Sequence, residues 1–402
     1  MRIRTSSRFR APPEGTPPDV PPDRVRRNLL LVIHSLSSGG AERALANLAN
    51  HWASNGHRVT VATLAPRTAD FYALSPSVAR IDLDLAGESR SAFEAVRANV
   101  RRIRGLRRVV QEVGPDIAIG FTSVVNVLLA LASLRMPCIT IGSEQIHPPR
   151  FPLGRAWNGL RAVTYRELDA VVVLTDDMRR WITAHTSARR VRVIPNPVWP
   201  LSPSGGGRPP EAVLPPHVKL LLAAGRLVRQ KGFDLLVDAF ATLAERHADW
   251  TLVILGDGEE RQALESQVER LGLAGRVLLP GVAGNIEDWY RRADIYVMSS
   301  RFEGFGNTLA EALAVGAPAV SFDCETGPAT IIRDGIDGVL VPPEDVRGLT
   351  AALDRLMRDN VLRARLAERA IEARDRFSVE RIARKWEDLF DELSAGTFAQ
   401  ST

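Results

Sequence analysis

The chain repeats one local pattern, in which a short apolar run is followed by a glycine-containing loop and an amphipathic helix. The run at residues 28–36, NLLLVIHSL, is of this kind, as are the runs that open residues 219–247 and 293–316. A strand without polar alternation is buried on both faces, as in a parallel sheet covered by helices. At least five strand–helix units follow residue 216. The pattern therefore predicts an α/β fold built from doubly wound parallel sheets.

The length of 402 residues favours two domains. The clearest boundary is the Pro-, Gly- and Ser-rich stretch 201–216, which separates a predicted first domain at 28–200 from a second at 217–377. Residues 1–27 are rich in Arg and Pro and contain no apolar run typical of a signal peptide, so we expect a disordered basic tail. The longest apolar stretch, 124–134, is too short to span a bilayer.

Charge is unevenly divided between the two halves. Residues 1–200 hold 28 arginines and no lysine against 16 acidic residues, whereas the remainder carries an acidic excess. A basic first half favours an anionic partner, such as nucleic acid, a membrane surface or a phosphate-bearing molecule. Only 6% of the residues are aromatic and they are not interleaved with the arginines, which argues against stacking on nucleic acid bases. Cys138 and Cys324 have no metal-ligand spacing, which fits a reducing, cytoplasmic location.

The segment 299–316, SSRFEGFGNTLAEALAVG, carries the strongest signal for a ligand. It joins a strand to a helix that begins near Asn307, and it places Glu303 at the strand's carboxyl end and Glu311 in the helix. Ligands bind at that edge of a parallel sheet, and free amides at a helix start receive phosphate oxygens. The two carboxylates then remain to accept hydrogen bonds from hydroxyls. Phosphates together with many hydroxyls describe a nucleotide sugar.

Two further loops follow strands in the same way. The loop after the strand at 219–224 carries Arg226 and Lys231, two cations that can neutralise a diphosphate. The loop after residues 28–36 contains Gly39 and Gly40 without the GxGxxG spacing of a dinucleotide site. These glycines either admit a bulky ligand or form a tight turn.

Other polar groups have a structural as well as a functional interpretation. Glu144 and His147 follow a strand end, where they either contact substrate or form surface hydrogen bonds. Asp82-Leu83-Asp84 resembles a DxD metal signature, but its alternation with apolar residues favours an edge strand.

A predicted helix at 91–113 combines an apolar face with a basic one. Val96, Val100, Ile103, Leu106 and Val110 share the apolar face. Arg97, Arg101, Arg104 and Arg108 follow the same spacing beside it. Such a helix either is an ordinary solvated one or contacts anionic lipid headgroups or a pyrophosphate-bearing substrate.

Taken in order, several of these stretches resemble the retaining nucleotide-sugar glycosyltransferases of family 4. The matching stretches are SSGGAER, IPNPV, GRLVRQKGFDLLVDAF, LGDGEE, EGFGNTLAEALAVGAPAV, DCETGP and IDGVLVPPED. The resemblance implies a GT-B fold, in which two Rossmann-like domains face one another across a cleft. It also implies that a final helix, here at 378–395, crosses back onto the first domain.

Carried over to this sequence, the resemblance assigns Arg226 and Lys231 to the donor diphosphate. It assigns Glu311 to the ribose hydroxyls and Glu303 to the 3- and 4-hydroxyls of the donor sugar. It implies that the backbone amides of four residues bind the sugar and phosphate, namely Phe305, Gly306, Asn307 and Thr308. It also implies that Gly39 and Gly40 leave room for the diphosphate and the acceptor. Because two cations and a helix N-terminus can stabilise the leaving diphosphate, no metal ion or other cofactor is expected.

One position departs from the family pattern. Many members have a His at a strand end of the first domain, where this chain has Ser143-Glu144-Gln145. Glu144 and Glu303 are therefore the candidate catalytic carboxylates, although neither is an evident nucleophile. Members of the family are thought to retain configuration by front-face attack within an ion pair.

The segment GPATII resembles bacterial enzymes that extend exopolysaccharides or lipid-linked glycans. A lipid-diphosphate acceptor and a position at the inner membrane leaflet would account for the arginine-rich helix. Uridine is the expected base of the donor, and the sugar is a hexose or an N-acetylhexosamine. Two alternatives remain at this point, namely a nucleotide-sugar 2-epimerase and a glycan- or nucleic-acid-binding scaffold without activity.

Overall fold

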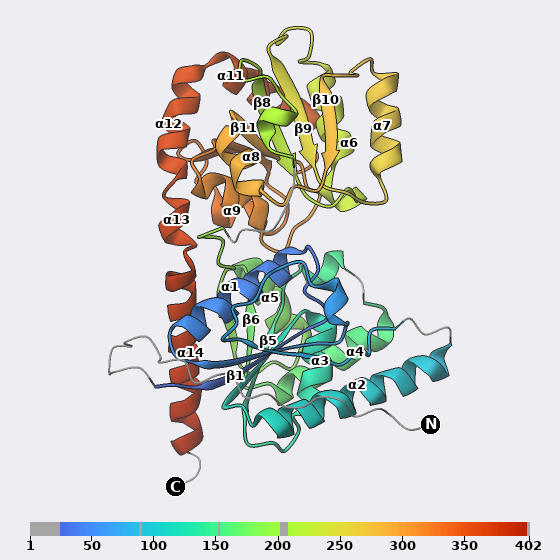
Figure 1. Ribbon diagram of the computed structural model, residues 1–402, viewed down its shortest axis with the longest axis vertical. Helices are drawn as coiled ribbons and strands as arrows, with labels where there is room; N and C mark the ends of the chain where they lie inside the picture. The colour runs from blue at the N-terminus through green and yellow to red at the C-terminus, as the bar shows by residue number, and fades with distance from the viewer. Residues whose placement is uncertain (1–24, 88–90, 152, 202–207, 400–402) are drawn as a thin grey trace.

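The computed structural model describes residues 25–87, 91–151, 153–201 and 208–399. Most of the predicted basic tail, at 1–24, and part of the predicted linker, at 202–207, lie outside the described residues. The chain forms two α/β domains stacked along the long axis of the molecule (Figure 1). The predicted fold class, two doubly wound parallel-sheet domains, is confirmed.

The first domain contains a seven-stranded sheet in the order β3-β2-β1-β4-β5-β6-β7, and all its strand pairs are parallel. Its strands are β1 (Asn28–Ile33), β2 (Arg58–Thr63), β3 (Ala79–Asp82), β4 (Ile117–Phe121), β5 (Ile139–Ser143), β6 (Ala170–Val173) and β7 (Val191–Val193). Its helices are α1 (Gly40–Ser54), α2 (Ala92–Val113), α3 (Ser123–Ala132), α4 (Arg155–Thr164) and α5 (Asp176–His185).

The second domain contains a six-stranded parallel sheet in the order β10-β9-β8-β11-β12-β13. Its strands are β8 (Lys219–Ala224), β9 (Trp250–Leu255), β10 (Val277–Gly281), β11 (Ile295–Met298), β12 (Ala319–Phe322) and β13 (Gly338–Val341). Its helices, with those that follow it, are α6 (Phe233–Ala241), α7 (Arg261–Arg270), α8 (Ile286–Arg292), α9 (Asn307–Ala314), α10 (Pro328–Ile331), α11 (Val346–Arg358), α12 (Asn360–Ala370), α13 (Ala373–Arg376) and α14 (Val379–Ala399).

Helix boundaries follow local capping chemistry. The Ser91 side chain accepts a hydrogen bond from the Glu94 amide at the start of α2, and Gly114 ends the helix with a left-handed φ of 53°. At the start of α5, the Thr175 hydroxyl accepts a hydrogen bond from the Met178 amide. These caps fix where each helix meets the sheet edge.

Each sheet reverses its winding direction at one point. In the first domain the reversal lies between β1 and β4, and in the second it lies between β8 and β11. Loops that leave the two strands at such a point diverge, and the crevice between them is where open α/β sheets bind ligands. The predicted loops at Gly39, Lys231 and Glu303 all leave strands at these two reversals.

The last helices run along one side of the molecule from the second domain to the first (Figure 1). α14 packs on α1, where the buried Trp386 side chain meets Trp52 edge to face at 6.2 Å and stacks with Phe121 at 6.4 Å. The backbone adds two links, since the Val198 amide donates to the Phe377 carbonyl and the Val379 amide donates to that of Trp199. A helix that follows the second domain thus completes the core of the first.

The predicted apolar face of α2 is buried only in the second half of the helix. Val96 and Val100 are 64% and 39% exposed, and Phe93 is 77% exposed, whereas Leu106 and Val110 are buried. α2 has 22 residues and packs mainly on α3, which has only 10. At 1.5 Å per residue the longer helix extends past its support, and its first turns have no core to cover.

We predict that Trp386→Ala destabilises the protein by about 3–5 kcal/mol, the usual effect of removing a large buried aromatic side chain. Chemical denaturation followed by circular dichroism measures this change. The control is Asp388→Ala, an exposed position on the same helix, where we expect a change within about 0.5 kcal/mol. Equal effects of the two substitutions would show that α14 does not contribute to the first domain's core.

Candidate functional site

Lys231 and Glu303 form the centre of the predicted donor site in the second domain. The Lys231 Nζ donates to Glu303 Oε1 at 2.6 Å, and the Ser300 hydroxyl donates to the same oxygen at 2.6 Å. Glu303 is 6% exposed, and the Thr326 hydroxyl also donates to its backbone carbonyl. The carboxylate is therefore fixed at the end of β11, and its Oε2 receives none of these bonds.

Arg226 lies in the loop after β8 and differs from Lys231 in its surroundings. Its side chain is exposed, and no carboxylate among the described residues lies within ion-pair distance of it. A guanidinium that is free of a tight partner is available to a phosphate. Of the two cations predicted to bind the diphosphate, Lys231 is therefore in an ion pair and Arg226 is not.

Glu311 lies on α9 and is only 1% exposed. Its Oε1 contacts the Arg43 guanidinium from α1 at 2.5 Å, and its Oε2 accepts from the Tyr290 hydroxyl at 3.0 Å. Burial and the neighbouring carboxylate hold the pKa of the Tyr290 hydroxyl well above its usual range, so this hydroxyl stays a donor. Both oxygens of the predicted ribose-binding carboxylate therefore have a protein partner.

The start of α9 faces the first domain. Gly306 adopts φ 100° just before the helix and provides no side-chain cap, so the first amides have no side-chain acceptor there. The Asn307 amide group donates to the Gly40 carbonyl at 2.8 Å and accepts from Asn196 at 3.2 Å. An uncapped helix start next to Arg226 and Lys231 is a suitable place for phosphate oxygens.

The other residues of this predicted loop contribute differently. Phe305 is buried and packs edge to face on Phe377 at 5.3 Å, so only its backbone is available to a ligand. Thr308 is half-buried on the first turn of α9. Gly304 lies so close to the first domain that a Cβ there would meet the Gln145 carbonyl at 2.2 Å.

The space beside Gly39 and Gly40 is filled by polar side chains. A Cβ on Gly40 would meet Asn307 Nδ2 at 2.6 Å, and one on Gly39 would meet Glu42 Oε2 at 2.1 Å. Burial raises the pKa of the Glu42 carboxyl, while its own backbone amide, the charge of Arg226 and the Ser37 hydroxyl act in the opposite direction. The glycines thus allow close contact between α1 and the second domain.

Glu144 lies inside the first domain, in contrast to the other candidates. It is fully buried, and its two oxygens accept from the hydroxyls of Ser123, at 2.6 Å, and Tyr165. Burial raises the pKa of its carboxyl, and the two hydrogen bonds oppose the shift. Its predicted catalytic role stays a prediction, and its surroundings favour a role in holding β5 and α3 together.

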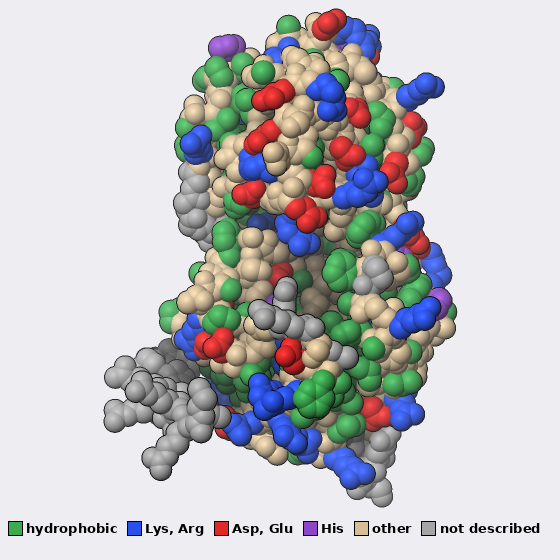
Figure 2. Space-filling view, turned by 90° about the vertical axis from the view of Figure 1, so that its right-hand side faces the viewer, with side chains coloured by type: hydrophobic (Ala, Val, Ile, Leu, Met, Phe, Trp, Pro, Cys, Tyr) green, Lys and Arg blue, Asp and Glu red, His purple; other side chains and the backbone are tan. Residues whose placement is uncertain are grey.

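A cavity of about 640 Å³ lies between the domains beside the Glu303 loop, where the surface is visibly hollowed (Figure 2). Its lining includes Arg229, Arg301 and Phe302 from the second domain and Arg150 from the first. Arg150 bonds Glu325 across the cavity at 2.7 Å and holds the pKa of that carboxyl below its usual value. The buried His147 lies 3.2 Å from the same carboxylate.

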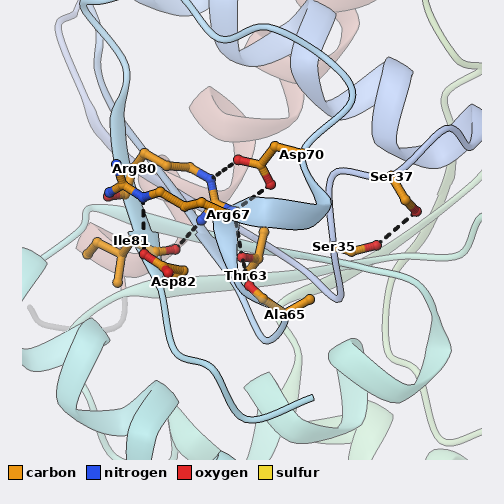
Figure 3. A network of polar contacts seen from close by, with 9 residues as sticks. All are labelled: Ser35, Ser37, Thr63, Ala65, Arg67, Asp70, Arg80, Ile81 and Asp82. Carbon is orange, nitrogen blue, oxygen red and sulfur yellow. Dashed lines mark hydrogen bonds and ion pairs between the residues drawn. The ribbon is translucent and has the colours of Figure 1, made fainter. Parts of the chain in front are cut away.

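The predicted edge strand at Asp82 is confirmed. β3 is the outermost strand of the first sheet, and Asp82 accepts from Arg67 at 3.0 Å. Figure 3 shows this pair beside the bonds from Arg80 to Asp70 and Thr63. In the described part of the chain, no group of three His, Cys, Asp or Glu side chains is arranged to hold a metal ion.

The arginines of α2 lie far from these groups, on the outside of the first domain. Arg102 and Arg107 bond backbone carbonyls and fix the helix. The four predicted contact residues Arg97, Arg101, Arg104 and Arg108 are exposed. The space-filling view of this side shows basic and apolar side chains close together on the lower domain (Figure 2).

Two Rossmann-like domains with their ligand-binding edges facing one another are the arrangement of the GT-B fold, and solved structures agree. Sucrose-phosphate synthase from Thermosynechococcus elongatus is 20% identical, with a TM-score of 0.77 over 92% of this chain and 100% of that one. HepE from Anabaena in complex with UDP is also 20% identical, with a TM-score of 0.71 over 91% and 100%. These similarities establish the fold.

Residues 38–200 match the family model described as Glycosyltransferase Family 4, and residues 209–373 match that described as Glycosyl transferases group 1. Together the matches cover most of both domains, and the chain belongs to these family 4-like glycosyltransferases. The amylovoran biosynthesis glycosyltransferase AmsD of Erwinia amylovora is 28% identical over 90% of this chain and 99% of its own.

Two other relatives differ in how much of their length is shared. An α-1,4-N-acetyl-D-galactosaminyltransferase of Campylobacter jejuni, whose name includes a glycan linked to PP-undecaprenol, is 27% identical over 90% of this chain and 98% of its own. An exopolysaccharide phosphotransferase of Streptomyces coelicolor is 35% identical over 72% of this chain, which spans only 30% of that protein.

The sequence reasoning missed four residues at the site, namely Glu42, Arg43, Asn196 and Tyr290. Glu42 and Arg43 belong to the SSGGAER stretch, in which only the glycines were singled out. An arginine three residues after the glycines would point from the first turn of α1, and this is the available signal. Nothing local indicates that Asn196 and Tyr290 face α9, because that depends on how the domains meet.

Stability as a function of pH tests the buried state of Glu144. Because the folded state raises the pKa above its ordinary 4.5, it binds the proton more tightly than the unfolded chain does. Stability from this group is therefore lost as pH rises from the unfolded value through the folded one. We predict that Glu144→Gln lacks this loss, so its unfolding free energy improves relative to the native protein as the pH is raised over a range that begins at the ordinary value of 4.5.

Urea denaturation of both proteins over that pH range makes the measurement, and parallel profiles would contradict the prediction. Turnover of the same variant tests the predicted catalytic role separately. A general acid or base contributes about 10²–10⁴-fold, so a loss of that size in a variant that remains folded would support it.

Proposed function

We propose that the protein transfers a hexose or N-acetylhexosamine from a nucleoside diphosphate sugar, with uridine as the base, to a growing envelope glycan. The observation that carries the proposal is that Lys231 pairs with Glu303 just before the uncapped start of α9, the helix that carries Glu311. Arg226 lies in the same loop as Lys231, and its charge acts on Glu42 of α1. Cations and free amides suit the diphosphate, and carboxylates suit sugar and ribose hydroxyls. The UDP bound in HepE, a protein of the same fold, supports the choice of nucleotide.

In the proposed reaction, the bond between the sugar C1 and the β-phosphate oxygen breaks, and a bond from C1 to an acceptor hydroxyl oxygen forms. The acceptor proton passes to the departing diphosphate, and the attack takes place on the same face, with retention. Arg226, Lys231 and the α9 amides stabilise the charge that develops on the diphosphate. Glu303 orients the sugar through its 3- and 4-hydroxyls. No metal ion takes part in this scheme.

The acceptor is proposed to be a lipid-linked glycan presented at the cytoplasmic face of the inner membrane. The names of the relatives from Erwinia and Campylobacter refer to an exopolysaccharide and to an undecaprenol-linked glycan. No helix in the described residues is both long and apolar enough to cross a bilayer.

The exposed stripe of α2 is the proposed contact surface. Phe93, Val96 and Val100 occupy its first turns, and the exposed arginines at 97, 101, 104 and 108 continue the same face. Exposed apolar groups enter the boundary between headgroups and acyl chains, and arginines pair with anionic headgroups. The cavity of 640 Å³ between the domains gives the glycan access to the Glu303 loop.

A panel of nucleotide sugars without acceptor tests the donor half of the proposal, with release of nucleoside diphosphate as the measurement. We expect slow release from one uridine-linked donor and a loss of 100-fold or more in Glu311→Ala, as for other groups that position a substrate. Glu269→Ala, an exposed position on α7, is the control. Interconversion of the donor without release of nucleoside diphosphate would indicate an epimerase. If no donor binds, the binding scaffold without activity would be the better interpretation.

Binding to liposomes tests the membrane surface. We expect the protein to sediment with anionic vesicles at low salt, and the double variant Arg101→Glu/Arg104→Glu to bind at least tenfold more weakly, since each basic side chain contributes about 1 kcal/mol. Arg179→Glu/Arg180→Glu on α5 changes the net charge equally at exposed positions. Equal losses in both double variants, or no binding by the native protein, would contradict a role for α2.

A further inference from the structure

The cleft contains an ion pair that joins the two domains and that the predicted donor contacts do not include. Arg43 on α1 lies 2.5 Å from Glu311 on α9, and the two side chains are 15% and 1% exposed. Burial disfavours the charge on Arg43, but Glu311, Tyr72 and Tyr290 more than offset it and raise its pKa. The guanidinium is therefore a permanent cation inside the cleft.

Arg43 is also held from its own domain. Its Nε donates to the Tyr72 hydroxyl at 3.3 Å, and its guanidinium lies over the Tyr72 ring, 5.4 Å from the centroid. Neither contact involves the second domain. The guanidinium would thus stay in place at the cleft if another group took Glu311.

The residue before Arg43, Glu42, has the opposite charge, and its neighbour is a cation instead of a carboxylate. Glu42 is on the same first turn of α1, and the charge of Arg226 acts on its carboxyl. The first turn of α1 therefore sets a carboxylate near the predicted diphosphate cation and a guanidinium on the predicted ribose carboxylate. Only the Glu42 carboxylate has the same sign of charge as the diphosphate, because the ribose hydroxyls that would replace Arg43 are neutral.

We propose that Arg43 is a further donor-binding residue, which pairs with Glu311 as seen here and with the donor diphosphate once ribose hydroxyls take its place at Glu311. The proposal rests on the function proposed above. Ribose hydroxyls are neutral, so when they displace Arg43 they leave a buried cation without its partner, which is costly. A diphosphate removes that cost, whereas a nucleoside does not.

Discrimination between a nucleoside diphosphate and its nucleoside follows from this exchange. Uridine has to break the Arg43–Glu311 pair without compensation, but UDP supplies a new anion for Arg43. The arrangement would make the cleft selective for phosphate-bearing ligands through a residue of the first domain, in addition to Arg226 and Lys231 of the second.

Isothermal titration of UDP and uridine into the native full-length protein and into Arg43→Met tests the proposal. We expect the variant to bind uridine about tenfold more tightly and UDP about tenfold more weakly, since a charged hydrogen bond contributes about 1.5–3 kcal/mol and tenfold corresponds to 1.4. An equal change for both ligands, in either direction, or an unchanged ratio would overturn it.

Arg58→Met is the matched control, because Arg58 is exposed at the opposite end of the sheet, at the start of β2. If Arg43→Met does not fold, Arg43→Lys keeps the charge but loses the planar fork. The lysine variant should shift the UDP-to-uridine ratio in the same direction by a smaller factor, and an unchanged ratio would again overturn the proposal.

The two proposals fail in different ways. If the native protein folds but binds neither UDP nor any other nucleoside diphosphate, the proposed function fails. If UDP binds and its advantage over uridine does not depend on Arg43, only the exchange fails.

Discussion

In a parallel sheet the carboxyl ends of all strands lie on the same side, and the loops that leave them can form a binding site there. The rest of this molecule depends on two such sides, one from each sheet, that face one another. β1 and β4 of the first domain and β8 and β11 of the second end at the same cleft. Because helices return the chain to the opposite edge, the loops can carry charged and polar groups without disturbing either core. The site is assembled from residues far apart in sequence, such as Gly40 and Asn307.

Two ion pairs lie in this cleft. Lys231 is paired with Glu303 within the second domain, and Glu311 is paired with Arg43 across the domains. Buried pairs of this kind add little net stability, but they are costly to break by removing one partner. In a ligand with both phosphates and hydroxyls, the hydroxyls can replace the cations at the two carboxylates, and the phosphates can then pair with those cations. Such an exchange is the basis of the donor selectivity proposed above.

Much of the fold follows from the sequence, because a fully apolar strand and an amphipathic helix are local patterns. The sequence also predicts where Glu303, Glu311, Arg226 and Lys231 lie, because each is at a strand's carboxyl end or in the helix after it; their roles as donor-binding residues stay predictions. Other features depend on tertiary packing. Arg43 became part of the site only through the docking of α1 on α9, and the exposure of Val96 follows from the short length of α3. The burial of Glu144 by Tyr165 and Ser123 is likewise invisible in a strand-end motif.

The central claim is that a nucleoside diphosphate binds between α1 and α9, and a crystal structure with UDP tests it most directly. The account predicts ribose hydroxyls within hydrogen-bond distance of Glu311 and the diphosphate at the start of α9, in contact with Arg226, Lys231 and the displaced Arg43 guanidinium. A nucleotide bound outside this cleft, or one bound there with the Arg43–Glu311 pair intact, would contradict it.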